Sequence, residues 1–145
     1  MEIHLAVTDA EIAACYPVMH ELRPHLSPDD FLARVQRQNN AGYRLAYAQA
    51  NDRPAAVAGF RLGENLAWGR FLYVDDLVTL SAHRSQGYGA RLLDWLRDYA
   101  LREGCDQLHL DSGMQRVDAH RFYEREGMLR AGYHFAQTLV QANLD

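Results

Sequence analysis

The chain has 145 residues, enough for one domain with its own hydrophobic core. Hydrophobic residues make up 48% of it and charged residues 23%, ordinary values for a soluble globular protein. No apolar run approaches the roughly 20 residues that span a bilayer, and the N-terminus lacks the basic and long apolar regions of a signal peptide. We therefore expect a single cytoplasmic domain over residues 1–145, without a membrane partner.

The net charge of −4 argues against a nucleic-acid partner, because nucleic acids favour basic surfaces. The same charge is compatible with a cationic substrate, and equally with a surface that only keeps the protein soluble. Cys15 and Cys105 form no CxxC motif, and no group of Cys and His has the spacing of a zinc site. We expect two reduced, buried thiols and no metal.

The first half of the chain predicts a strand, helices and then three strands. Ile3 to Val7 is typical of a short strand, and Thr8 or Asp9 caps a helix towards His20 that Pro17 should kink or split. The other predicted elements are a helix over 29–38, strands over 43–49, 55–62 and 68–80, and turns at 51–54 and 63–65. Because these connections are short, we expect three consecutive antiparallel strands.

From Gly87 the apolar residues recur at helical spacing, and Gly104 marks the end of that helix. A strand over 107–110, a helix over 117–126 and a final strand from Tyr133 to Val140 follow. The predicted order is β-α-α-β-β-β-α-β-α-β. This order indicates an α/β (α+β) fold, with a mixed, mostly antiparallel sheet flanked by about four helices.

The connection between the long strand and the helix that follows it carries Gly87 and Gly89. These glycines let the backbone turn tightly, so that amide N–H groups at the helix start can point outward. Arg84 adds a positive charge beside those amides. Together with the helix dipole, these groups predict a site for phosphate or pyrophosphate. The alternative is a helix-capping turn without a ligand.

Two segments resemble the signatures of the GCN5-related N-acetyltransferase (GNAT) family. Residues 84–89, Arg-Ser-Gln-Gly-Tyr-Gly, match its Arg/Gln-x-x-Gly-x-Gly/Ala motif. Residues 119–128 are similar to its Ala-x-x-Phe-Tyr-x-x-x-Gly-Phe motif, with Met128 in the place of the last Phe. Residues 116–123 resemble a small-molecule branch that includes aminoalkylphosphonate N-acetyltransferases. Arg116 stands where the family often has Asn, so the contact of that Asn to the cofactor is not carried over.

The resemblance implies the GNAT fold and acetyl-CoA as co-substrate, with no metal. The pyrophosphate would lie on the amides of the glycine-containing loop, and the pantetheine would pair like an extra strand with the end of the long strand. The residues implied in cofactor binding are Leu77, Val78, Thr79, Leu80, Arg84, Ser85, Gln86, Gly87, Tyr88, Gly89 and Ala90.

Acetyl transfer to an amine needs a neutral amine, a stabilised oxyanion and a proton for the leaving thiolate. The resemblance places Tyr123 near the cofactor sulfur, where a phenol can donate that proton. Asp76, and after it Asp75, are the candidates for the base or the anchor of the substrate ammonium. Adjacent residues of a strand point to opposite faces unless a bulge intervenes, so we expect at most one of these acids to face the acceptor. The alternatives are that Tyr123 only packs, with its hydroxyl satisfied elsewhere, and that one of the two acids faces solvent while the other forms a salt bridge.

The sequence therefore predicts an N-acetyltransferase that moves the acetyl group of acetyl-CoA to a primary amine by direct attack in a ternary complex. The acceptor is a small molecule or a protein amine; the alternative is a catalytically inactive CoA-binding sensor or interaction module. Glu21, Arg23 and His25 lie between the first two predicted helices, a region that shapes the acceptor site in the family. A homodimer through the final strand is compatible with the pattern, which does not require it.

Overall fold

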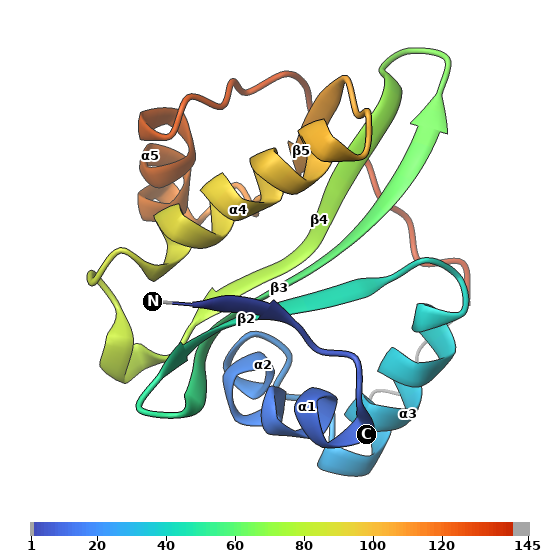
Figure 1. Ribbon diagram of the computed structural model, residues 1–145. Helices are drawn as coiled ribbons and strands as arrows, with labels where there is room; N and C mark the ends of the chain where they lie inside the picture. Colours follow the sequence, from blue (N-terminus) through green and yellow to red (C-terminus); the bar gives the residue numbers. More distant parts are fainter. Residues whose placement is uncertain (1, 141–145) are drawn as a thin grey trace. The chain divides into compact units, whose positions relative to one another are not determined.

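The computed structural model describes residues 2–140 (Figure 1). The chain divides into two units, the first ending at Leu110 and the second beginning at Asp111, and each is described by itself. Within the described range, no helix is both long and apolar enough to cross a membrane.

The first unit is built on a five-stranded sheet in the order β1-β2-β3-β4-β5. The strands are β1 (Ile3–Leu5), β2 (Arg44–Ala50), β3 (Arg53–Asn65), β4 (Gly69–Thr79) and β5 (Gln107–Leu110). All neighbours are antiparallel except β4 and β5, so the prediction of a mixed, mostly antiparallel sheet is confirmed. The turn predicted at 63–65 is wrong, because β3 continues to Asn65 and the chain reverses over 66–68. The Asn65 side chain stabilises that reversal by accepting the Trp68 N–H at 2.6 Å.

Helices cover both faces of this sheet (Figure 1). On one face lie α1 (Asp9–Ala14), α2 (Tyr16–Leu22) and α3 (Pro28–Asn39), and on the other lies α4 (Tyr88–Arg102). The predicted break at Pro17 is confirmed, since α1 ends before Cys15 and Pro17 lies in the first turn of α2. Thr8 and Glu11 form a capping box at the start of α1.

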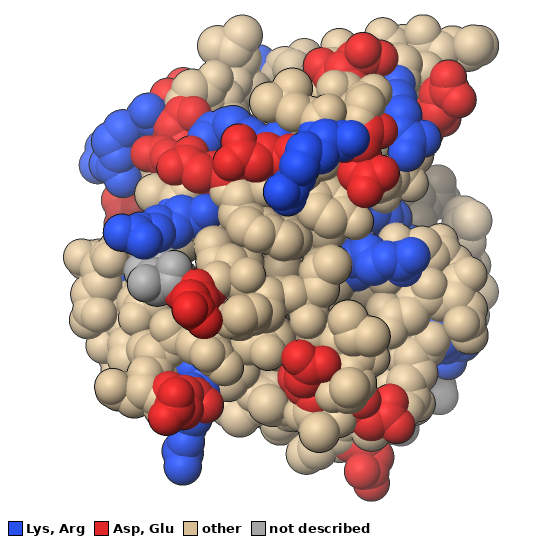
Figure 2. Space-filling view, in the orientation of Figure 1, with Lys and Arg blue, Asp and Glu red and all other residues tan. Residues whose placement is uncertain are grey.

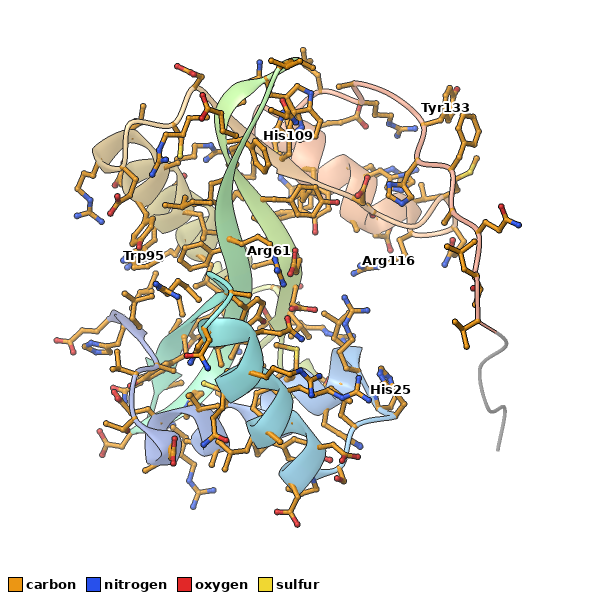
Figure 3. The ribbon with its side chains drawn as sticks, turned by 90° about the vertical axis from the view of Figure 1, so that its right-hand side faces the viewer. His25, Arg61, Trp95, His109, Arg116 and Tyr133 are labelled. Atoms are coloured by element: carbon orange, nitrogen blue, oxygen red, sulfur yellow. The ribbon has the colours of Figure 1, made fainter. Side chains whose placement is uncertain are left out.

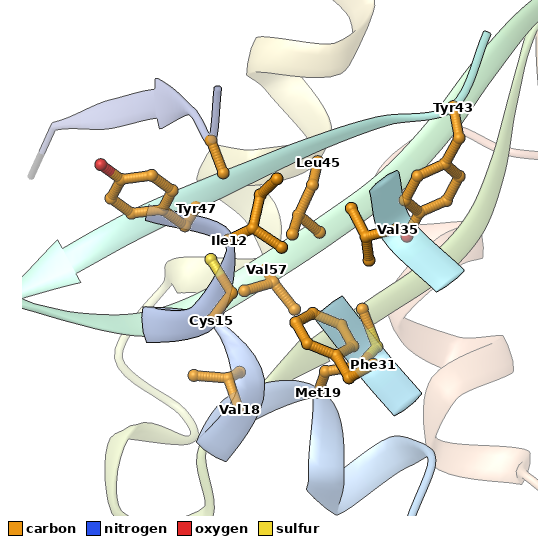
Figure 4. Packing of buried hydrophobic residues seen from close by; sticks show 11 residues of the cluster. Ile12, Cys15, Val18, Met19, Phe31, Val35, Tyr43, Leu45, Tyr47 and Val57 are labelled. Atoms are coloured by element: carbon orange, nitrogen blue, oxygen red, sulfur yellow. The ribbon is translucent and has the colours of Figure 1, made fainter. Parts of the chain in front are cut away.

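The core fills the space between the sheet and the first three helices (Figure 4). Its buried residues include Ile12, Val18, Met19, Phe31, Val35, Tyr43, Leu45 and Val57. On the opposite face, the buried leucines of α4 pack towards the sheet while its outer face carries both acidic and basic side chains (Figure 2). Because both faces are covered, the middle of β3 and β4 is held firmly in place.

The second unit contains α5 (Val117–Arg125), which ends before Gly127 at φ 93°. The final strand predicted from Tyr133 to Val140 is wrong, because these residues have no strand pairing in the described chain. Tyr133 and Phe135 are 82% and 93% exposed, so their alternation does not correspond to a buried face. A strand forms only when a neighbour takes up its backbone hydrogen bonds, which the alternating pattern cannot supply.

Candidate active site

A β-bulge in β4 places two carboxylates on one face of the sheet. Gly59 of β3 lies opposite Asp76, but the next residue, Phe60, lies opposite Val74, so no residue of β3 lies opposite Asp75. The extra residue cancels the normal alternation. The expectation that the acids point to opposite faces is therefore wrong: Asp75 and Asp76 line the same pocket.

This pocket has a volume of about 400 Å³ and lies between the sheet and the helices α2 and α3. Its apolar lining is Met19, Leu26, Phe31 and Val35. Its polar lining is Arg23, His25, Arg34, Gln38, Tyr43, Asp75 and Asp76. His25 lies on the connection between α2 and α3 (Figure 3). An apolar wall with a few convergent polar groups is typical of a small-molecule site.

Both oxygens of Asp76 are occupied. Arg23 contacts Oδ1 through Nε at 2.9 Å and Nη2 at 2.8 Å, and the Tyr43 hydroxyl donates to Oδ2 at 2.8 Å. Gly59 makes room for this arrangement, because a Cβ there would lie 1.7 Å from the Tyr43 hydroxyl oxygen and 2.7 Å from Asp76 Oδ2. Asp76 is thus a fixed carboxylate at the wall of the pocket.

Tyr43 is 3% exposed, and its burial, followed by the nearby Asp76 charge, raises its pKa well above 10. The phenol therefore stays protonated and remains a hydrogen-bond donor to Asp76 across the working pH range. The Arg61 guanidinium lies 5.4 Å from the Tyr43 ring centre and packs over that ring.

Asp75 is held through one oxygen only. Arg61 lies on β3 (Figure 3). It contacts Asp75 Oδ2 through Nε at 2.9 Å and Nη2 at 2.7 Å, and its Nη2 also donates to Gln38 Oε1 at 3.0 Å. Among the described residues, Asp75 Oδ1 has no hydrogen-bond partner. This oxygen is available to a ligand in the pocket.

Beyond the bulge, the edge of β4 that faces away from β3 pairs with no strand among the described residues, and we call it the open edge of β4. The parallel pairing with β5 ends at Val74, while the pairing with β3 continues to Thr79. The Leu80 N–H donates to Ala55 O at 2.8 Å and so points towards β3. Because successive residues of a strand direct their N–H and C=O groups to opposite edges, those of Leu77 and Thr79 point to the open edge. The pairing of pantetheine with the segment from Leu77 to Leu80 stays a prediction.

The glycine-containing loop follows β4 through a short 3₁₀ turn (Ser81–His83). Gly87 caps α4 in the left-handed region at φ 87°, no side chain caps the helix, and Ser85 also has a positive φ of 62°. The first amides of α4 are therefore available to an anion. Glu21 of α2 accepts hydrogen bonds from the backbone and hydroxyl of Ser81 and lies 3.5 Å from Arg84 Nη2.

Tyr123 lies on α5 in the second unit. Burial raises its pKa above 10, an effect that the positive charge of Arg116 opposes. The phenol is thus protonated at neutral pH, as a proton donor to a thiolate must be. Its place near the cofactor sulfur stays a prediction.

Sequence reasoning found part of this site. It singled out Asp75, Asp76, Arg23 and His25, which line the pocket. Four further site residues were not identified: Arg34, Gln38, Tyr43 and Arg61. They lie in segments that the sequence pattern predicted as a helix and as strands, without a role in a site. Gly59 was the available signal, because a glycine in a strand often marks a bulge or a close approach.

The profile of the Acetyltransferase (GNAT) family matches residues 7–128. The chain belongs to this family. This acetyltransferase is 37% identical over 127 residues to the uncharacterised N-acetyltransferase YhdJ of Bacillus subtilis. The match covers 86% of this chain and 89% of that protein. It is 29% identical over 126 residues to the aminoalkylphosphonate N-acetyltransferase of Salmonella typhimurium, covering 86% and 80% of the two chains.

A solved structure shares the fold. The structure of AAC(6')-Iy in complex with a bisubstrate analogue, CoA-S-monomethyl-acetylneamine, has a TM-score of 0.84 at 13% identity, over 94% of this chain and 96% of that one. The GNAT fold that the motifs predict is thereby confirmed, together with the prediction of an acetyltransferase enzyme.

Proposed function

We propose that this enzyme transfers the acetyl group of acetyl-CoA to a primary amine of a small molecule. The observation that carries the proposal is the pair Asp75 and Asp76, which the bulge turns into one pocket beside the open edge of β4. The pocket volume of about 400 Å³ lies within the range of small-ligand sites.

The comparisons support a small acceptor. The Salmonella relative is named for aminoalkylphosphonates, and the AAC(6')-Iy structure holds an analogue that joins CoA to acetylneamine. Both names describe amines of modest size. A protein acceptor would need a groove long enough for a peptide, whereas the pocket here has a volume of about 400 Å³ and is lined by residues of α2 and α3.

The residues present fit acetyl-CoA, which would supply the thioester. The pyrophosphate would lie on the amides of residues 86–90 with Arg84 beside it, since these amides are uncapped. The pantetheine would pair with the open edge of β4 from Leu77 to Leu80. The N–H groups of Leu77 or Thr79 would then donate to the oxyanion that forms on attack.

The two acids take different parts. Asp75 Oδ1, which is free of partners among the described residues, would bind the ammonium of the acceptor and accept its proton, directly or through water. Asp76, whose oxygens are both occupied by Arg23 and Tyr43, would keep the wall of the pocket in place. The neutral amine would then attack the thioester carbonyl, and the C–S bond would break to release CoA as a thiolate. We assign Tyr123, from the resemblance, as the group that would donate a proton to that thiolate, and the proton lost by the newly acylated nitrogen would restore the phenol through water. In the sequence analysis Asp76 was preferred to Asp75, and this assignment reverses that order.

Calorimetric titration with acetyl-CoA, followed by chromatographic detection of CoA release with a panel of amines, tests the proposal. We expect saturable binding that is lost in Arg84→Ala/Gly87→Glu, and turnover that falls in Asp75→Asn more than in Asp76→Asn. Binding without turnover of any amine would favour an inactive CoA-binding module. A folded protein that does not bind acetyl-CoA would refute the assignment.

A further inference from the structure

The arginines around the pocket differ in their partners. Arg23 contacts Asp76, and Arg61 contacts Asp75. Arg34 also lines the pocket but forms no ion pair with any carboxylate in the described part of the chain. Asp30 precedes it by four residues on α3, the spacing of a common helical ion pair, and yet the two side chains do not pair.

The pocket therefore presents two groups of opposite charge that no protein group pairs with among the described residues. One is Asp75 Oδ1 on β4, and the other is the Arg34 guanidinium on α3. A ligand with an ammonium and an anionic group would satisfy both, and His25 at the same pocket adds a further donor for the anion. Although the whole chain has a net charge of −4, Arg34 makes the α3 side of the pocket positively charged.

Resting on the proposed function, we propose that the acceptor is a primary amine that carries a carboxylate or phosphonate, and that Arg34 selects it. Guanidinium binds both anions through two parallel hydrogen bonds, and such charge-assisted contacts are among the stronger ones in proteins. The amine would lie against Asp75 with the anion pointing to α3. A polycationic acceptor is disfavoured, because its second ammonium would face Arg34.

The experiment compares wild type, Arg34→Gln and the control Arg37→Gln. Arg37 is exposed on the same helix and does not line the pocket. The acceptors are 2-aminoethylphosphonate, β-alanine, propylamine and putrescine, so that phosphonate, carboxylate, neutral and cationic tails are compared. Binding of 2-aminoethylphosphonate to the CoA-saturated protein is measured by calorimetry as a readout that needs no turnover.

We expect wild type and Arg37→Gln to prefer one or both anionic amines. In Arg34→Gln, kcat/KM for these amines should fall roughly 10- to 100-fold, with less than about a 2-fold change for propylamine. The better of the two anionic amines identifies the anion.

Preference for propylamine or putrescine, or an Arg34→Gln enzyme that keeps the wild-type preference, would overturn this inference and leave the proposed function standing. Binding of 2-aminoethylphosphonate that is lost in Arg34→Gln, without acetylation of any amine, would refute the proposed function and the acceptor, and would support only the part of the inference that assigns Arg34 to the anion. Neither binding nor turnover with any amine would refute both.

Discussion

Gly59→Ala is expected to damage the acceptor site and the fold together. The new Cβ would lie 1.7 Å from the Tyr43 hydroxyl oxygen and 2.5 Å from Tyr43 Cζ, so the buried Tyr43 ring would have to move from its place against Asp76. Overpacking of this kind costs about 1–3 kcal/mol. For a chain of 145 residues this corresponds to a decrease in Tm of roughly 3–10 °C.

The same clash displaces the oxygen that donates to Asp76, so kcat/KM for the amine should fall at least about 10-fold while the Kd for acetyl-CoA stays unchanged. Differential scanning calorimetry measures the decrease in Tm. Amine-saturation kinetics, at a temperature 20 °C below the Tm of the less stable variant, measure the decrease in kcat/KM. Gly63→Ala is the matched control on β3, because its Cβ would meet the Phe71 ring at 2.6 Å, away from the acids. It should lower Tm and spare the kinetics. A Gly59→Ala enzyme with wild-type Tm and amine kinetics would refute the geometry derived for the bulge.

Three further predictions concern the cofactor side of the enzyme. Tyr123→Phe should lower kcat by about 100-fold with little change in the Kd for acetyl-CoA, as measured by rapid quench and calorimetry, since the variant lacks the proton donor; unchanged turnover would remove Tyr123 from the mechanism. Arg84→Gln should weaken acetyl-CoA binding by roughly 10-fold, and less so at high salt, because Arg84 is exposed; a salt-independent Kd equal to that of wild type would contradict this. Hydrogen bonds from the Ser81 side chain and backbone hold the pKa of Glu21 below 4.5. The Glu21 carboxylate therefore stabilises the folded state above pH 4.5, and this stabilisation is lost as the pH falls through the lowered pKa. Thermal melts of wild type and Glu21→Gln should therefore differ at pH 7 and converge below pH 4.5. A difference that grows on acidification would show that the Glu21 carboxylate is not responsible.

Periodic patterns in the sequence were enough to predict most of the framework. The capping residues and Pro28 marked the start of α3, and Pro17 marked the break between α1 and α2, because proline and cap residues act through their own local backbone. The final strand from Tyr133 to Val140 failed for the opposite reason. Its alternation is local, but a strand depends on a partner that the sequence does not specify.

In the pocket, too, the features set by local sequence could be predicted, and those that depend on a second strand could not. Acids in the middle of a strand stood out as unusual, and so Asp75 and Asp76 were identified. Their common direction depends on a register shift between β3 and β4, which is a property of the pair of strands. Tyr43 and Arg61 could not be predicted as site residues, since each acts through contacts with residues distant in the sequence.

The most direct test of the account is to incubate the enzyme with acetyl-CoA and 2-aminoethylphosphonate or propylamine, and to measure CoA and N-acetylated product together by mass spectrometry. All 15 basic residues of the chain other than histidine are arginines, so no lysine side chain of the enzyme can consume acetyl groups during the assay. We expect CoA and N-acetyl product to accumulate in equal amounts with at least one amine, and Asp75→Asn to slow the formation of both. Release of CoA without acetylated product, or no release with any amine, would contradict direct transfer to a small amine.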